Sequence, residues 1–198
     1  MPSSTVTLLF AFFVAASVLV KLWLDTRQAR HVARHRDAVP PAFADEVPLR
    51  SHQRAADYTL DKLRFGLVNT AVSTAVLLGW TLLGGLDALN QLTLSLMGPG
   101  MGQQVALVVS FALIGGLLGL PLSWYQTFGI EQRFGFNNTK PSLWGSDLFK
   151  GLLVGALLGL PILWLVLWLM QAGGSIWWLW AWGALAVKWL AGPPMAWI

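Results

Sequence analysis

GLLVGALLGLPILWLVLWLM, residues 151–170, is a run of twenty residues without one charged side chain. A helix needs about 20 mostly apolar residues to cross a hydrocarbon core about 30 Å thick, so this stretch predicts a transmembrane helix. Similar runs occupy residues 6–24, 65–83 and 105–122, and a shorter, tryptophan-rich run occupies residues 176–190. We therefore predict an all-α fold, a polytopic membrane helical bundle of about five transmembrane helices that forms a single membrane domain, residues 1–198.

The overall composition supports a membrane protein. Hydrophobic residues make up 56% of the chain and charged residues 11%, against roughly 45–50% and about 25% in ordinary globular proteins. A soluble chain of this kind would expose large apolar patches, so we expect the lipid bilayer as a partner. The basic residues lie between apolar runs instead of forming one basic face, so nucleic acid is not expected as a partner. Cysteine is absent, which excludes disulfides and thiolate metal ligands.

The basic residues also predict an orientation. Eight lysines and arginines lie in residues 25–64 and three in residues 123–150, whereas residues 84–104 have none. Because cytoplasmic loops are enriched in lysine and arginine, we expect residues 25–64, residues 123–150 and the C-terminus in the cytoplasm, with the N-terminus outside. Residues 1–5 lack the basic segment of a signal peptide, so the first run is interpreted as an uncleaved anchor, in a bacterial inner membrane.

Helical structure is expected to continue outside the membrane spans. Residues 25–39 contain neither glycine nor proline and should extend the first helix until Pro40 and Pro41 stop it. A second polar helix should begin near Ser51 and run into the second span. Residues 86–97 are apolar enough for an interfacial helix, whereas residues 123–150 are expected to form a polar loop.

Small residues recur at helical spacing on two of the spans. Such residues let helix backbones approach closely in a membrane. We therefore predict helix packing at Gly115 and Gly119 of the third span and at Gly151, Gly155 and Gly159 of the fourth.

Two histidines are spaced like zinc ligands on a helix. His31 and His35 lie one turn apart, but Val32 follows the first histidine, where a metalloprotease helix has a glutamate as general base. Nearby arginines would repel a dication, and His52 has no companion ligand. We therefore predict no metal site, no catalytic residue and no cofactor in this chain.

Residues 123–150 are the most informative connector, because they combine charges, aromatic rings and amides. Composition alone leaves two interpretations open, a docking surface and a merely ordered loop. Within it, residues 130–139, IEQRFGFNNT, with Asp147 and Lys150, resemble the pattern I-E-x-x-x-G-F-N-x-T…D…K. That pattern belongs to the N-terminal membrane domain of the CAAX prenyl protease type 1 family, integral-membrane zinc metallopeptidases. Residues 50–59 are similar to the family's approach to the second span, and the resemblance covers about residues 22–187.

The resemblance implies the non-catalytic half of such an enzyme, because the family's zinc helix, H-E-x-x-H, lies downstream of the fifth span. Zinc would then belong to the complete family enzyme only. A downstream or separately encoded protease domain would be the partner. The residues implied to form the loop that meets it are Glu131, Arg133, Gly135, Phe136, Asn137, Thr139, Asp147 and Lys150.

Our leading hypothesis is therefore a membrane-anchoring, chamber-forming domain that is inactive by itself, as a truncated or separately encoded chain. A stand-alone membrane scaffold that binds a partner through residues 123–150 is the alternative. A small permease ranks third, because only Asn69 and its hydroxyl neighbours could supply polar groups at mid-membrane.

Overall fold

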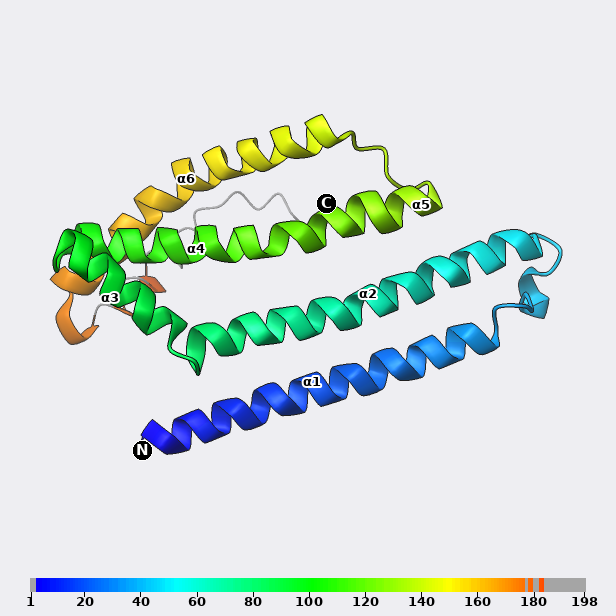
Figure 1. The fold of residues 1–198 in the computed structure, drawn as a ribbon, viewed down its shortest axis with the longest axis horizontal. Coiled ribbons are helices and arrows are strands. Elements are labelled where there is room, and N and C mark those ends of the chain that lie inside the picture. Colours follow the sequence, from blue (N-terminus) through cyan, green and yellow to red (C-terminus); the bar gives the residue numbers. More distant parts are fainter. Residues whose placement is uncertain (1–2, 177, 180–181, 184–198) are drawn as a thin grey trace. The chain divides into compact units, whose positions relative to one another are not determined.

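The computed structural model describes residues 3–176, 178–179 and 182–183, and every regular element within them is helical. Figure 1 shows the long helices. In chain order the elements are α1 (Ser3–Arg34), η1 (Pro41–Phe43), α2 (Leu49–Thr81), α3 (Gly85–Met97), α4 (Met101–Trp124), η2 (Tyr125–Glu131), α5 (Gln132–Phe134), α6 (Pro141–Ala172) and η3 (Gly174–Ile176). The prediction of an all-α fold is confirmed.

Four stretches within the described residues are long and apolar enough to cross a membrane: Ser4–Arg34, Leu49–Thr81, Met101–Phe134 and Pro141–Ala172. Three of them contain a predicted span whole, and Leu49–Thr81 contains residues 65–81 of the predicted span 65–83. The fifth predicted span, residues 176–190, lies mostly outside the described residues.

The exposure of the described side chains suits a lipid environment. Few apolar residues are buried, among them Ile130 and Phe134, whereas large apolar side chains along the helices are exposed, such as Leu8 at 70% and Leu157 at 74%. Water would make such a surface aggregate, but lipid tails are as apolar as leucine. The chain is an integral membrane protein.

The ends of the first two helices differ from the predicted ones. Helix α1 ends at Arg34 and residues 35–37 form a turn, so the expected extension to residue 39 is wrong. Helix α2 begins at Leu49, and the carbonyl of Pro48 accepts the first hydrogen bond, from the Ser51 backbone N–H at 2.9 Å. Ser51 therefore lies inside the helix and does not cap it.

The third connector is the largest departure from the predicted elements. Helix α4 passes directly into η2, a π-helical segment, and then into α5, while α6 already begins at Pro141. Only residues 135–140 are non-helical. The polar residues of this connector show where the apolar part of the helix ends. The helix itself continues, because a helix satisfies its backbone hydrogen bonds in water as well as in lipid.

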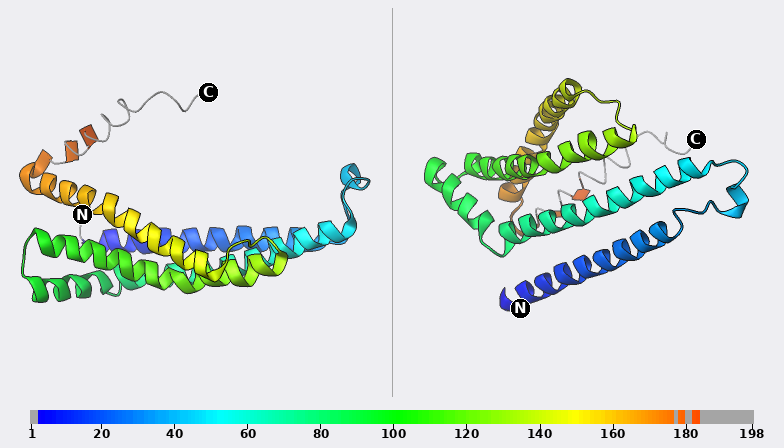
Figure 2. Two further views of the ribbon diagram at one scale, coloured as in Figure 1. Left: turned by 90° about the horizontal axis from the view of Figure 1, so that it is seen from above. Right: turned by 45° about the vertical axis from the view of Figure 1, so that its right-hand side comes forward.

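The structure divides into two compact units. The first contains residues 1–88 and 114–139, and the second contains residues 89–113 and the described part of residues 140–198. Within the first unit, α1 and α2 lie side by side and are joined at one end through η1, as Figures 1 and 2 show.

Within the second unit, a buried polar cluster joins α3 to the start of α4. The Gln103 amide donates hydrogen bonds to Asn90 Oδ1 at 2.9 Å and to Thr93 Oγ1 at 3.0 Å. Gln103 and Thr93 are each only 6% exposed. A turn at Gly98, which has a φ of 69°, reverses the chain so that these side chains meet.

Candidate functional site

The end of α1 is fixed to the polar half of α2 by a two-point ion pair. Arg36 donates from Nε and Nη2 to the two carboxylate oxygens of Asp57, at 2.7 and 2.9 Å. Arg36 Nη1 also contacts Asp37 at 2.9 Å, and the same Asp37 oxygen accepts from Gln53. The hydrogen bond and the charge of Asp57 hold the pKa of the Arg36 guanidinium above its ordinary value. This network orients α2 relative to the turn after α1.

The same half of α2 receives the loop motif, which we define as residues 130–139. Arg54 Nη2 donates a 2.6 Å hydrogen bond to the backbone carbonyl of Phe134. One turn further along α2, the Tyr58 ring lies 5.3 Å from the Phe134 ring and 4.8 Å from the Phe136 ring, centroid to centroid. The loop motif therefore lies directly against α2, and Phe134 is buried there.

Gly135 reverses the chain at the end of α5. Its φ of 76° lies in the left-handed region that L side chains rarely adopt. The Gly135 N–H donates to the Gln132 carbonyl at 3.1 Å, and the Phe136 N–H donates to the Glu131 carbonyl at 2.9 Å. This pair of bonds is a Schellman cap. Arg54 complements it by binding the Phe134 carbonyl, which the helix leaves free.

Asn137 and Thr139 shape the second half of the loop motif. Asn137 Oδ1 accepts a 2.6 Å hydrogen bond from the Thr139 backbone N–H, an Asx turn. Lys140 is extended and Pro141 begins α6. The N-x-T portion of the motif thus has a backbone-shaping role, just as glycine does in the G-F portion.

The two charged residues of the loop motif contact different neighbours. Arg133 forms a 3.1 Å ion pair with Asp61 of α2, although its side chain is 70% exposed. The Glu131 carboxylate receives a longer hydrogen bond from Gln126, at 3.4 Å. The Arg133 pair adds a third contact between the motif and α2, and its exposure makes that contact weak.

The remaining residues of the predicted interaction site lie on α6, in the second unit. Asp147 and Lys150 are three residues apart on that helix and approach each other to 3.7 Å. At the five glycines predicted to pack, an added Cβ would meet no heavy atom within 4 Å in the described structure. Their packing role therefore stays a prediction.

The α2 residues that hold the loop motif were not singled out as site residues in the sequence analysis. Arg54, Tyr58 and Asp61 follow the spacing i, i+4, i+7 and therefore share one face of the helix. The resemblance rested on residues 50–59 and on the loop motif, and these two stretches contact each other in the structure. Helical spacing across that stretch was the signal that could have identified these residues.

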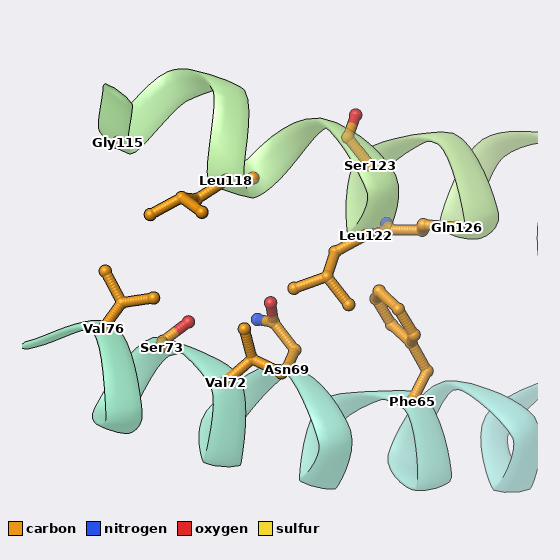
Figure 3. A pocket seen from close by; sticks show the side chains of 11 residues that line it. Phe65, Asn69, Val72, Ser73, Val76, Gly115, Leu118, Leu122, Ser123 and Gln126 are labelled. Carbon is orange, nitrogen blue, oxygen red and sulfur yellow. The ribbon is translucent and has the colours of Figure 1, made fainter. Parts of the chain in front are cut away.

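A pocket of about 360 Å³ lies further along α2, between its apolar half and the end of α4. Asn69, Ser73, Ser123 and Gln126 are its polar lining residues, among apolar neighbours. Figure 3 shows Asn69 from α2 and Leu122 from α4 pointing toward one another across it. Amide and hydroxyl groups in this apolar segment can hold a polar group or water where lipid alone would not.

Two of the three histidine rings, those of His35 and His52, contact backbone carbonyls, and the His31 ring lies against the His35 ring. His35 Nδ1 lies 2.8 Å from the His31 carbonyl, and His52 Nε2 lies 2.8 Å from the His35 carbonyl. No group of three or more potential metal ligands of the His, Cys, Asp or Glu type occurs among the described residues. In the structure, His35 and His52 thus contact backbone carbonyls at the turn where α1 ends.

The chain matches one protein family. The family model described as the CAAX prenyl protease N-terminal, five membrane helices, matches residues 28–191. The chain belongs to this family. The matched region contains the loop motif and the α2 face that binds it, and its five membrane helices agree with the number of predicted spans.

Curated relatives of the CAAX prenyl protease family are similar over most of this chain. The CAAX prenyl protease 1 homolog of Homo sapiens is 29% identical over 188 residues, which cover 88% of this chain and 38% of the relative. The CAAX prenyl protease 1 of Saccharomyces cerevisiae is 26% identical, over 73% of this chain and 34% of its own length. This chain thus spans little more than a third of the relatives it matches.

A solved structure has the same fold. The crystal structure of S. mikatae Ste24p matches 93% of this chain with a TM-score of 0.83 and 24% sequence identity, and the match covers 44% of that chain. The family model shows that the chain corresponds to the N-terminal membrane domain of the CAAX prenyl proteases.

Proposed function

We propose that this chain is the membrane-anchoring, chamber-forming domain of a CAAX-prenyl-protease-like zinc metalloendopeptidase. Its helices would form part of the wall around the reaction space, and the loop motif would meet the protease domain. The catalytic zinc would be held by that protease domain, because the 198 residues contain no H-E-x-x-H sequence. The chain by itself would then hydrolyse no peptide.

The contact between the loop motif and α2 carries this proposal. A capped turn, an arginine bound to the freed carbonyl and two aromatic contacts hold residues 134–136 in one conformation. Phe136 nevertheless keeps 58% of its surface exposed. A rigid loop with an exposed aromatic side chain is suited to binding another protein domain, because little ordering entropy remains to be lost.

The pocket lined by Asn69, Ser73 and Gln126 supports the chamber part of the proposal. Peptide hydrolysis inside a membrane protein needs a space that water can enter, and polar side chains in an otherwise apolar segment favour such a space. This same pocket would also suit a permease, but the apolar halves of α2 and α4 around it carry no charged residue that could drive transport.

A chimera tests the proposal directly. In the Homo sapiens relative, the segment matched by this chain would be replaced by the chain itself, and cleavage of a prenylated CAAX peptide measured in membranes. We expect zinc-dependent cleavage above that of the relative's remaining segment alone, and none from this chain alone with added zinc. A chimera that is inserted and folded but inactive would contradict the chamber role, and hydrolysis by the isolated chain would contradict its inactivity.

We further propose the orientation that the basic residues indicate, in a bacterial inner membrane. Residues 25–64, the loop motif and the C-terminus would face the cytoplasm and the N-terminus the outside. Eleven of the thirteen lysines and arginines would then lie on the cytoplasmic side in the two basic connectors, as the positive-inside rule requires.

A further inference from the structure

A patch of arginines that form no ion pair with a carboxylate of the described residues lies where α1 leaves its apolar run. We define the arginine patch as Arg27, Arg30 and Arg34 together with Trp23. These side chains are exposed and, together with His31 and His35, line a groove of about 380 Å³. At 100° per residue the four residues of the arginine patch fall within about a sixth of the helix circumference. The partly covered residues of the same stretch, Asp25, Ala29 and Val32, fall on the opposite side of the helix, so the patch faces away from α2.

The carboxylates nearest in sequence are already used by other residues. Asp25 pairs with Lys21 at 2.9 Å, and Asp37 pairs with Arg36 at 2.9 Å. The three arginines of the patch form no ion pair with any carboxylate of the described residues. Three guanidinium groups thus present their charge to whatever surrounds the helix.

The position of the patch along α1 indicates what surrounds it. The apolar run ends at Leu24, and the Arg27 guanidinium lies over the Trp23 ring at 5.5 Å from its centroid. Tryptophan rings are enriched at the membrane interface. Arg27 and Arg30 follow Trp23 by about 6 and 10 Å along the helix axis. One headgroup layer is about 5–8 Å deep, so the Cα of Arg27 lies within that depth and the Cα of Arg30 lies just beyond it.

The direction of the helix brings the charges closer to the bilayer. In an α-helix each Cα–Cβ bond tilts toward the helix N-terminus, and the N-terminal part of α1 is the apolar run. The arginine side chains therefore extend back toward the membrane surface. Their planar guanidinium groups match phosphate oxygens in a two-point geometry.

We propose that the arginine patch binds the phosphate headgroup of an anionic phospholipid, with Trp23 against its glycerol and upper acyl region. The groove carries only cations and aromatic or histidine rings, so it fits a negative headgroup and offers no carboxylate to a choline or ethanolamine group. The proposal depends on the membrane location of α1 and is independent of the relation to the protease domain.

Native mass spectrometry of the full chain in detergent tests this proposal. Phosphatidylglycerol and phosphatidylcholine with identical acyl chains are titrated separately, and the dissociation constant of the first bound lipid is compared. We expect phosphatidylglycerol to bind more tightly, with the preference lost in the Arg27→Gln/Arg30→Gln variant. A basic residue near a membrane contributes about fivefold to the binding of anionic lipid. Arg34→Gln should have a smaller effect, because Arg34 lies about 6 Å further from the bilayer than Arg30.

The matched control is Lys140→Gln/Lys150→Gln, which removes the same charge outside the patch. We expect it to retain the preference for phosphatidylglycerol. Equal binding of both lipids, an unchanged preference in the arginine variant or an equal loss in the control would overturn the proposal. So would displacement of phosphatidylglycerol by glycerol phosphate at the same concentration, which would indicate a site for soluble phosphate. Tighter binding of a hexaglutamate peptide than of the lipid would indicate an acidic protein partner instead.

Discussion

Arg54 of α2 and Phe134 of α5 are eighty residues apart in sequence and are joined by a 2.6 Å hydrogen bond from Nη2 to the backbone carbonyl. Helix ends leave carbonyl groups without partners inside the helix. A charged donor from a second helix satisfies this one, which makes the bond both a helix cap and a tertiary contact. The loop motif is thereby fixed to the α2 face.

Replacing Arg54 by glutamine should loosen the loop motif. A hydrogen bond from a charged group contributes about 1.5–3 kcal/mol, and partial exposure of Arg54 lowers the expected loss to about 1 kcal/mol. Hydrogen exchange of the amides in residues 132–139 should become faster, and thermal unfolding in detergent should shift to a lower temperature. The control is Arg50→Gln, one turn earlier on the same helix, which has no hydrogen bond or ion pair from its side chain among the described contacts. Equal exchange in the two variants would contradict the cap.

Replacing Gly135 by alanine should destabilise the protein by about 1–2 kcal/mol. The φ of 76° is unfavourable for alanine, and the added Cβ would lie 3.2 Å from Arg54 Nη2. Gly145→Ala is the matched control, because Gly145 is within α6 and its Cβ would meet nothing within 4 Å. That control should be neutral or slightly stabilising, since alanine favours a helix. Chemical denaturation in detergent compares the two, and a loss that is not larger for Gly135→Ala would be inconsistent with the left-handed cap.

Replacing Gln103 by leucine should destabilise the second unit. The Asn90 and Thr93 oxygens would lose their donor while buried or partly buried, and an unsatisfied buried polar group costs about 1–3 kcal/mol. Gln104→Leu is the control, because Gln104 makes only a 3.5 Å contact with Gln171. Both variants are compared by thermal unfolding in detergent. If the unfolding temperatures of the two variants fall by the same amount, the buried cluster does not stabilise the α3–α4 turn.

A cysteine pair should report the contact between the loop motif and α2. The natural chain has no cysteine, so a Tyr58→Cys/Phe136→Cys variant can be joined by a short bis-maleimide without background reaction. We expect efficient cross-linking, because the two rings are 4.8 Å apart. Arg50→Cys with Phe136→Cys should react poorly, since position 50 lies about 12 Å further along the helix axis. Equal yields from the two pairs would mean that the loop motif is not held at Tyr58.

Single cysteines test the proposed orientation. A membrane-impermeant maleimide applied to intact cells should label Ser95→Cys, which lies in the connector without basic residues, and should leave Phe136→Cys unlabelled until the membrane is permeabilised. Both side chains are exposed, so neither is shielded by the fold. Labelling of position 136 in intact cells would reverse the orientation.

The sequence was sufficient for the class of fold and for the family. Uncharged runs such as residues 151–170 are typical of membrane spans, and two residue types of the loop motif suit the backbone conformation that it adopts. Gly135 is needed for a left-handed φ and Asn137 for an Asx turn. Both requirements are local, so a short sequence motif is enough to reveal them.

Helix ends and long-range partners were decided by tertiary structure. The polar residues after Leu122 predicted a loop, yet the helix continues to Phe134, whose buried side chain packs against Tyr58 of α2. Arg54 is one of eight basic residues in its connector, and only folding brings it to the Phe134 carbonyl. Local rules act over a few residues, whereas the choice of partner depends on which surfaces the chain brings together.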